Sequence, residues 1–96
     1  MSDITVVAKI RAKHDRIDEV KKVLLSLIEP TRKEYGCIKY ILHQGNEDPS
    51  IFVFYEIWQD EKLLHNHMNT KHFKEVLFLL EDKTVEAEIN FLNELQ

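Results

Sequence analysis

Residues 52–73 read FVFYEIWQDEKLLHNHMNTKHF, and this stretch carries the clearest signals for the fold. A short helix with His65 and His67 is predicted over 60–69. Ahead of it, a strand is predicted over 51–58, because β-branched and aromatic side chains fill both of its faces. A strand that is apolar on both faces belongs in the centre of a sheet that is covered on both sides.

The remaining elements follow from alternation and helical spacing on either side of this strand. Apolar and polar residues alternate from Ile4 to Arg11, which predicts a half-buried strand. A helical stripe of apolar residues follows, with Asp15 as its predicted N-cap, a break near Pro30 and an end at Gly36. Two further strands are predicted over 37–44 and 84–95. One further helix, capped by Thr70, is predicted over 70–82. The order β-α-β-β-α-β predicts an α+β fold of the ferredoxin-like type, as one domain over 1–96.

This order leaves one face of the sheet without a cover. Both main helices of a ferredoxin-like unit lie on the same face, and a chain of 96 residues has no further layer to place on the other. A second copy packed sheet to sheet would bury the exposed face, so a homodimer is predicted. In the last strand, Val85, Ala87, Ile89 and Phe91 are expected to face inward, toward the helices.

Composition excludes several classes of protein. The net charge of −4 and the absence of a basic cluster argue against nucleic acid as a partner. No apolar run approaches the roughly 20 residues that span a bilayer, and residues 1–10 lack the pattern of a signal peptide. The single cysteine, Cys37, cannot form an internal disulfide, which suits a reducing compartment. A cytoplasmic protein with neither a nucleic-acid nor a membrane partner is therefore expected.

Trp58 and Glu56 are the first candidates for a functional site. The only tryptophan, Trp58, shares one face of the strand with Phe54 and Glu56. It is either a core residue or a pocket wall that stacks on a planar ligand. A carboxylate such as Glu56 on an apolar face needs a partner or has a raised pKa. It is expected either to form an ion pair with Lys9 or Arg11, or to act as a catalytic acid or base.

The histidines give the second set of candidates. His67 follows Leu63 and Leu64 at helical spacing and is expected to face inward, either as a structural histidine or as a pocket group that moves a proton. His65 is expected to point elsewhere, and His72 to orient the helix that it begins. Their spacing lacks the i, i+4 pattern of a helical zinc pair, so no metal is expected. No glycine-rich loop for a nucleotide exists, and Cys37 has no evident activator.

Several motifs together resemble the antibiotic biosynthesis monooxygenase (ABM) family, with its quinol monooxygenase-like members. The segment from Thr31 to Tyr40, TRKEYGCIKY, is similar to the family pattern TR-x-E-x-GC-x-x-Y. Further matches are Glu56-x-Trp58, His67 and the pair His72-Phe73. The resemblance covers nearly the whole chain and implies a dimeric α/β-barrel of two ferredoxin-like protomers. It also implies that Phe54, Glu56, Tyr40, Phe73 and His72 bind the substrate.

The implied activity is oxygenation of a small electron-rich aromatic, such as a quinol, without a cofactor. In that scheme Trp58 is the wall of the pocket and His67 accepts or orients the proton. Two branches of the family place an asparagine where this chain has Phe54 or Ala8, which disfavours haem degradation and leaves the substrate open. A non-redox enzyme, such as an isomerase of a small signal molecule, and a ligand-binding protein without catalysis are the alternatives on the same scaffold.

Overall fold

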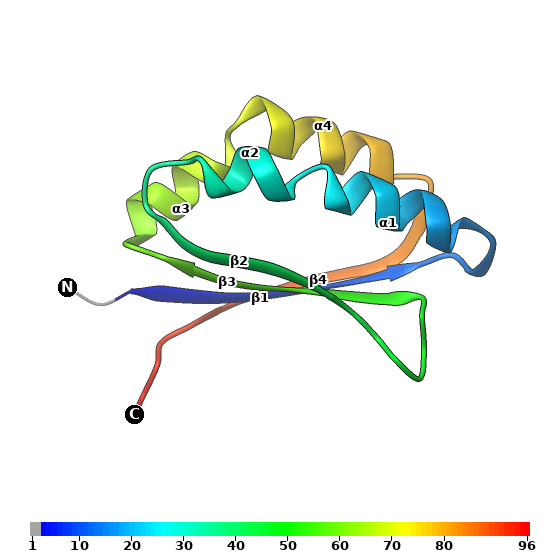
Figure 1. Cartoon of the computed structure of the whole chain (residues 1–96), viewed down its shortest axis with the longest axis horizontal. Coiled ribbons are helices and arrows are strands. Elements are labelled where there is room, and N and C mark those ends of the chain that lie inside the picture. Colours follow the sequence, from blue (N-terminus) through cyan, green and yellow to red (C-terminus); the bar gives the residue numbers. More distant parts are fainter. Residues whose placement is uncertain (1–2) are drawn as a thin grey trace.

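The computed structural model describes residues 3–96 as an antiparallel sheet with helices on one face (Figure 1). Met1 and Ser2, at the start of the stretch where no signal peptide was expected, lie outside the described residues. The strand order is β2-β3-β1-β4, which confirms the ferredoxin-like α+β prediction. The strands are β1 (Ile4–Ala12), β2 (Cys37–Gln44), β3 (Ile51–Trp58) and β4 (Thr84–Leu92), and the helices are α1 (Ile17–Leu25), α2 (Ile28–Arg32), α3 (Glu61–Met68) and α4 (Lys71–Leu80).

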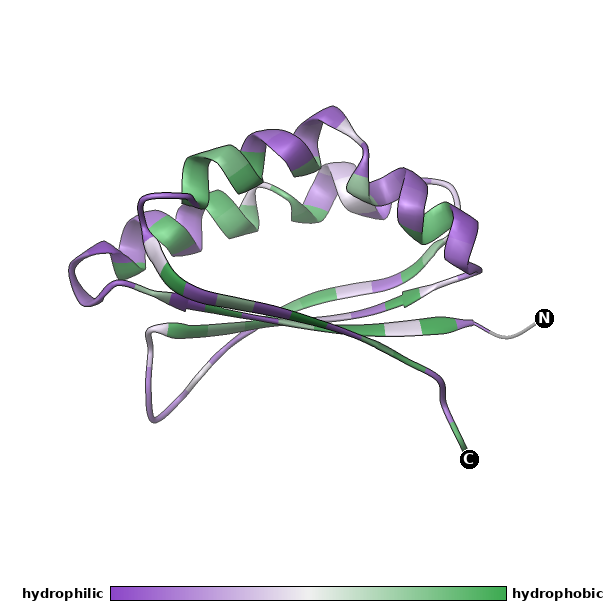
Figure 2. Cartoon of the chain, turned by 180° about the vertical axis from the view of Figure 1, so that it is seen from behind, coloured by the Kyte–Doolittle hydropathy of each residue, from purple (hydrophilic) through white to green (hydrophobic). Residues whose placement is uncertain are grey.

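The strand β3 lies between β1 and β2, as its two apolar faces predicted. Phe52, Phe54, Glu56 and Trp58 point toward the helices and are all buried. Hydrophobic and hydrophilic segments alternate along the strands and helices, as expected for elements that each bury one side (Figure 2). The helix-facing side of β3 is therefore the floor on which any pocket between sheet and helices must rest.

The segment predicted as one helix with a break near Pro30 forms a 3₁₀ turn and two separate helices. A short 3₁₀ turn precedes α1, and the prediction that Asp15 caps this helix is wrong, because Arg16 holds that position without a side-chain bond. The chain then breaks between α1 and α2, where the amide of Leu27 bonds to Leu24 at 3.1 Å in 3₁₀ fashion. Pro30 sits in the first turn of α2, where a missing amide is tolerated.

The path from α2 into β2 depends on Gly36. This residue has φ of +90°, a conformation that favours glycine, and a Cβ there would lie 2.5 Å from Cδ1 of Leu63 on α3. Its carbonyl accepts a bond from the amide of Gln59, at 2.8 Å. Gly36 therefore lets the segment that carries Glu34 approach α3 closely.

Two side-chain caps position α3 and α4. Asp60 accepts a hydrogen bond from the amide of Leu63 at 2.9 Å, and Thr70 accepts one from Phe73 at 3.3 Å. The predicted cap by Thr70 is thus confirmed. Because these helices are separated by a single turn, His67 near the end of α3 and His72 at the start of α4 come close together. None of the helices within residues 3–96 is long and apolar enough to cross a membrane.

The edge strand β4 differs from its prediction. Ala87, Ile89 and Phe91 are paired with β1 residues that face the helices, as expected. However, the side chains of Ile89 and Phe91 are 49% and 52% exposed, because the helices do not extend over this edge. The strand also ends at Leu92 rather than Leu95. The helix-facing side of β4 therefore forms an open apolar border beside the core.

The other face of the sheet, called the open face below, has no helix over it (Figure 1). Arg11 lies on this face, where it pairs with Asp48 at 2.9 Å and with Glu86 at 3.3 Å. Lys9 follows the same alternation along β1, whereas Glu56 points to the helices. The expected ion pair between Glu56 and Lys9 or Arg11 is therefore wrong, because the sheet separates these side chains.

Candidate functional site

A pocket of about 220 Å³ lies between the sheet and the helices. Tyr40, Glu56 and His67 form its buried polar part, in which Tyr40 and Glu56 are cross-strand neighbours and the rings of Tyr40 and His67 are 5.6 Å apart. The expected ligand-binding residues Phe54 and Phe73 also line this pocket, but Trp58 and His72 do not. Most of the remaining lining is aliphatic and includes Val6, Ala8, Leu24, Leu64, Val76 and Leu80.

Trp58 lies behind the pocket wall instead of forming it. It is fully buried, and its ring is 4.6 Å from the His67 ring, tilted by 32°. Its indole Nε1–H donates a hydrogen bond of 2.9 Å to Oε1 of Glu56. Trp58 therefore holds two pocket residues in place, Glu56 by a hydrogen bond and His67 by ring contact, which differs from the expected stacking on a ligand.

Glu56 is a buried carboxyl group with an unusual protonation equilibrium. Burial raises the pKa of its carboxyl group to about 7, and the negative charge of Glu34 acts in the same direction. The hydrogen bond from Trp58 opposes this shift because it favours the charged form. Among residues 3–96, no cation pairs with Glu56. Its carboxyl group is therefore an acid–base group that titrates near neutral pH, inside the pocket.

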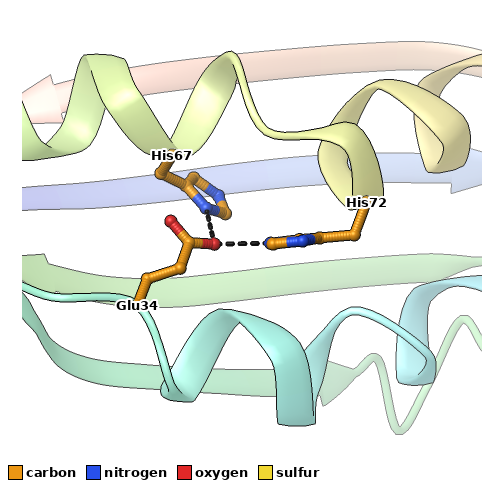
Figure 3. Close-up of side chains that lie close together, drawn as sticks. All are labelled: Glu34, His67 and His72. Atoms are coloured by element: carbon orange, nitrogen blue, oxygen red, sulfur yellow. Dashed lines mark hydrogen bonds and ion pairs between the residues drawn. The ribbon is translucent and has the colours of Figure 1, made fainter.

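His67 is held by Glu34, which lies in the segment between α2 and β2 (Figure 3). The His67 Nδ1–H donates to Oε2 of Glu34 at 2.9 Å, and the Nε2–H of His72 donates to the same oxygen at 2.5 Å. This assignment of protons follows from the carboxylate, which can only accept. The buried His67, the partly buried Glu34 and the more accessible His72 form a row from the core toward solvent.

The bond to Glu34 leaves Nε2 of His67 without a proton. Burial lowers the pKa of His67, partly offset by Glu34, so the imidazole is neutral at pH 7 with its free lone pair on Nε2. Within the described part of the chain, this buried nitrogen has no hydrogen-bond partner. Buried polar atoms are rarely left unpaired outside functional sites. Because His67 lines the pocket, a ligand with an O–H or N–H group would satisfy Nε2.

Glu34 is the site residue that the sequence did not reveal. His65 is exposed and points away from His67, as predicted, and Glu34 is the residue that joins His67 to His72. The available signal was the position of Glu34 within the motif TR-x-E.

The possible ligand atoms of Glu34, His67 and His72 lie within 4.8 Å of one another, a set that could hold a metal ion. However, Oε2 of Glu34 already bonds both nitrogens directly, so the geometry favours a hydrogen-bonded cluster.

Two further groups stay protonated. Burial raises the pKa of the Cys37 thiol to about 11, with Glu34 adding to the shift, so this thiol is a poor nucleophile at pH 7. Burial likewise raises the pKa of Tyr40, whose ring stacks on Phe54 with centroids 4.8 Å apart. His67 and Glu56 therefore remain as the groups of the pocket that can exchange protons near neutral pH.

Comparison with known proteins agrees with the fold and the motifs. The Pseudomonas aeruginosa protein PA3566 has a crystal structure that matches with a TM-score of 0.96 at 31% identity, over 100% of this chain and 97% of that one. The crystal structure of a conserved protein from Methanosarcina mazei matches with a TM-score of 0.91 at 41% identity, over 99% of this chain and 95% of that one. The Synechocystis protein sll1783 is 33% identical over 72 residues, which are 75% of this chain. This match spans about half, 49%, of the length of sll1783.

The family-level match covers most of the chain and includes the hydrogen-bonded residues of the site. The profile of the antibiotic biosynthesis monooxygenase family matches residues 3–77, which contain Glu34, Glu56, Trp58, His67 and His72. The fold is shared with the two solved structures above over nearly the full length of each chain. The chain therefore belongs to the antibiotic biosynthesis monooxygenase family.

Proposed function

We propose that this protein is a monooxygenase that oxidises a small electron-rich aromatic substrate, such as a quinol, with dioxygen and without a cofactor. The observation that carries this proposal is the unpartnered Nε2 of His67, a fixed and neutral base on the wall of an apolar pocket. Removal of a proton from a phenol makes the aromatic ring a stronger electron donor. The deprotonated substrate can then pass an electron to dioxygen, and the two radicals combine.

The residues around the pocket support each part of this reaction. Nε2 of His67 accepts the proton, and Oε2 of Glu34 stabilises the imidazolium through Nδ1–H. Phe54, Phe73 and the aliphatic lining exclude water, which strengthens these electrostatic interactions and suits an apolar oxidant. Trp58 keeps His67 in position from behind. In this scheme, Trp58 supports the base, and Phe54 and Phe73 contact the aromatic substrate.

The activity is tested by oxygen consumption with a panel of reduced quinols and anthrone-like phenols in metal-free buffer. We expect uptake that is saturable in substrate, proportional to protein and unaffected by EDTA. Mass spectrometry in ¹⁸O₂ should show one labelled oxygen atom in the product. Tight binding of these compounds without any oxygen uptake would contradict the proposal and favour the ligand-binding alternative.

The charges of the pocket disfavour an isomerase that acts on a phosphorylated signal molecule. The pocket lining includes the acidic residues Glu56 and Glu81, whereas Lys9, the cationic residue among its described lining, has its side chain on the open face. A phosphate group would approach these acidic groups without a cationic side chain to neutralise it, whereas a neutral phenol needs none. The lining thus favours an uncharged substrate that carries a hydrogen-bond donor.

We also propose that two copies form a homodimer through their open faces. Val7, Val53 and Ile57 are only half-buried there, and Ile41 and Tyr55 are each 36% exposed. Apolar side chains in the middle of an uncovered sheet are the expected core of an isologous contact between identical copies. The partner would complete the barrel implied by the resemblance and stiffen the floor of each pocket.

The dimer is checked by multi-angle light scattering at micromolar concentration. The wild-type protein should give a molar mass of two chains, and Tyr55→Asp should shift it toward one, because a carboxylate would be buried in the contact. Phe78→Asp, which alters a 73%-exposed side chain on α4, serves as the control and should leave the mass unchanged. A single-chain mass for the wild type would contradict the dimer.

A further inference from the structure

We propose that Glu56 is the acid of this site, which protonates the peroxide that dioxygen forms on the substrate, while His67 is the base that starts the reaction. This inference rests on the proposed oxygenation and goes beyond it, because it divides the two proton transfers between two groups. In the sequence, Glu56 is one carboxylate on an apolar strand face. In the structure, it is held beside the base by a shared aromatic residue.

The geometry places the two groups on the same pocket. Glu56 and His67 both line it, and Trp58 contacts both, through the 2.9 Å bond to Oε1 of Glu56 and a ring separation of 4.6 Å from His67. Because Trp58 occupies Oε1, the other carboxyl oxygen, Oε2, is available to a ligand. Among residues 3–96, Oε2 of Glu56 makes no hydrogen bond. The carboxyl group is therefore fixed in orientation, with one oxygen free for proton transfer.

The surroundings of Glu56 favour its protonated form. Val6 on β1, opposite Glu56, carries no charge, and Tyr40 on β2 is neutral. Cys37 on β2 stays a thiol, and the charge that acts on the pKa of Glu56 is that of Glu34. Burial and Glu34 raise the pKa of Glu56 to about 7.

His67, on α3 above the sheet, is shifted in the opposite sense, because burial lowers its pKa. When environments push two groups apart in this way, one can serve as acid and the other as base at the same pH. At pH 7 the site thus contains a neutral base and an acid that is about half protonated, with the protonated share rising as pH falls.

The proton transfers balance for a substrate whose reacting carbon carries two hydrogens or the tautomeric equivalent. His67 takes the first proton, an electron passes to dioxygen, and the radicals combine into a C–O–O⁻ peroxide. Glu56 gives its proton to the terminal oxygen and becomes a carboxylate. That carboxylate removes the second hydrogen of the carbon as a proton, the O–O bond breaks, and a C=O group forms. The hydroxide that leaves takes the proton of the His67 imidazolium, so that water forms and both residues return to their initial states.

The variant Glu56→Gln tests this role without removing the contact to Trp58, because the amide oxygen still accepts from the indole. We expect the rate of product formation to fall on the order of 10²-fold, as for loss of a general acid. Oxygen uptake should fall less, with hydrogen peroxide released in place of the missing product. The wild-type rate should decline as pH rises through about 7, and the variant should lose this decline. Glu75→Gln, an exposed change on α4, is the control and should behave as wild type.

Thermal unfolding measures the protonation of Glu56 without any substrate. Its ordinary pKa is 4.5, and the folded value is about 7, so the folded state binds more protons between these values. The stabilising effect of the protonated form is complete below pH 4.5 and is lost as pH rises through 7. The Tm of wild type should therefore fall relative to that of Glu56→Gln over this interval and run parallel to it outside.

The outcomes separate this inference from the proposed function. If Glu56→Gln forms product at the wild-type rate without peroxide release, Glu56 is not the acid, although the oxygenase proposal stands. Parallel Tm curves for wild type and Glu56→Gln between pH 4.5 and 7 would show an ionised Glu56 and overturn the inference as well. If the wild type consumes no oxygen with any substrate, both proposals fail together.

Discussion

His67→Ala is expected to lower oxygen uptake with a reduced quinol about 10³-fold, because it removes the group that accepts the substrate proton. The loss should appear in kcat more than in KM, since the apolar lining that binds the aromatic ring remains. Free imidazole, added at millimolar concentration, should restore part of the rate by entering the space that the side chain leaves. Oxygen-electrode assays at several imidazole concentrations measure both effects.

His65→Ala is the matched control, because His65 lies on the same helix but is exposed and outside the pocket. It should retain the wild-type rate, with no response to imidazole. Unchanged turnover in His67→Ala would show that His67 is not the base. A fall that imidazole cannot reverse, together with an altered circular dichroism spectrum, would show that His67 serves only to hold the fold.

Glu34→Gln separates the base from the group that orients it. The glutamine keeps the size of Glu34 and an oxygen that can accept from Nδ1–H of His67, but it loses the negative charge that strengthens this bond and the bond from His72. ¹⁵N NMR should then show a weaker preference of His67 for the tautomer with the proton on Nδ1, and kcat should fall with little change in KM. The NMR measurement does not depend on the substrate, so it tests the orientation of the base independently of the oxygenase proposal.

Phe52→Ala is expected to destabilise the fold by about 3–5 kcal/mol, the range for a large buried aromatic residue. Phe52 is 1% exposed in the central strand β3 and faces the helices. Its loss would leave a cavity that the surrounding sheet cannot close. Urea unfolding followed by fluorescence of Trp58, the single and fully buried tryptophan, gives the change in the free energy of unfolding.

Phe78→Ala removes the same side chain from a position that is 73% exposed on α4. Substitutions at such positions usually change stability by less than about 0.5 kcal/mol. The difference between the two variants isolates the contribution of burial from that of residue type. Equal effects of both substitutions would contradict the position of β3 at the centre of the sheet.

The sequence was sufficient for the architecture because the signals for it are local and periodic. Alternation along residues 51–58 predicted a strand apolar on both faces, and the structure places β3 between two neighbours. The position of Thr70 ahead of apolar residues at helical spacing predicted the cap of α4, and the structure confirms it. Two predicted ends of elements failed. These are the 3₁₀ start of α1 and the outer end of β4, an edge with no second neighbour to extend it.

The sequence also named several of the side chains of the pocket, since Tyr40, Phe54, Glu56, His67 and Phe73 all line it. It could not assign their partners. Glu34 and His67 are 33 positions apart and meet only because Gly36 brings the end of α2 close to α3. Whether Glu56 pairs with a cation or with Trp58 depends on which face of the sheet each side chain occupies, and Arg11 is on the other face.

By itself, therefore, the sequence determined the elements, their order and the burial of β3, because each depends on the spacing of apolar residues along the chain. Only the tertiary structure decided which carboxylate holds His67, where Trp58 lies and why Glu56 has a pKa near 7. The physical reason is that hydrogen bonding and desolvation depend on distances between segments that are remote in sequence. Those distances are fixed when the helices dock on the sheet.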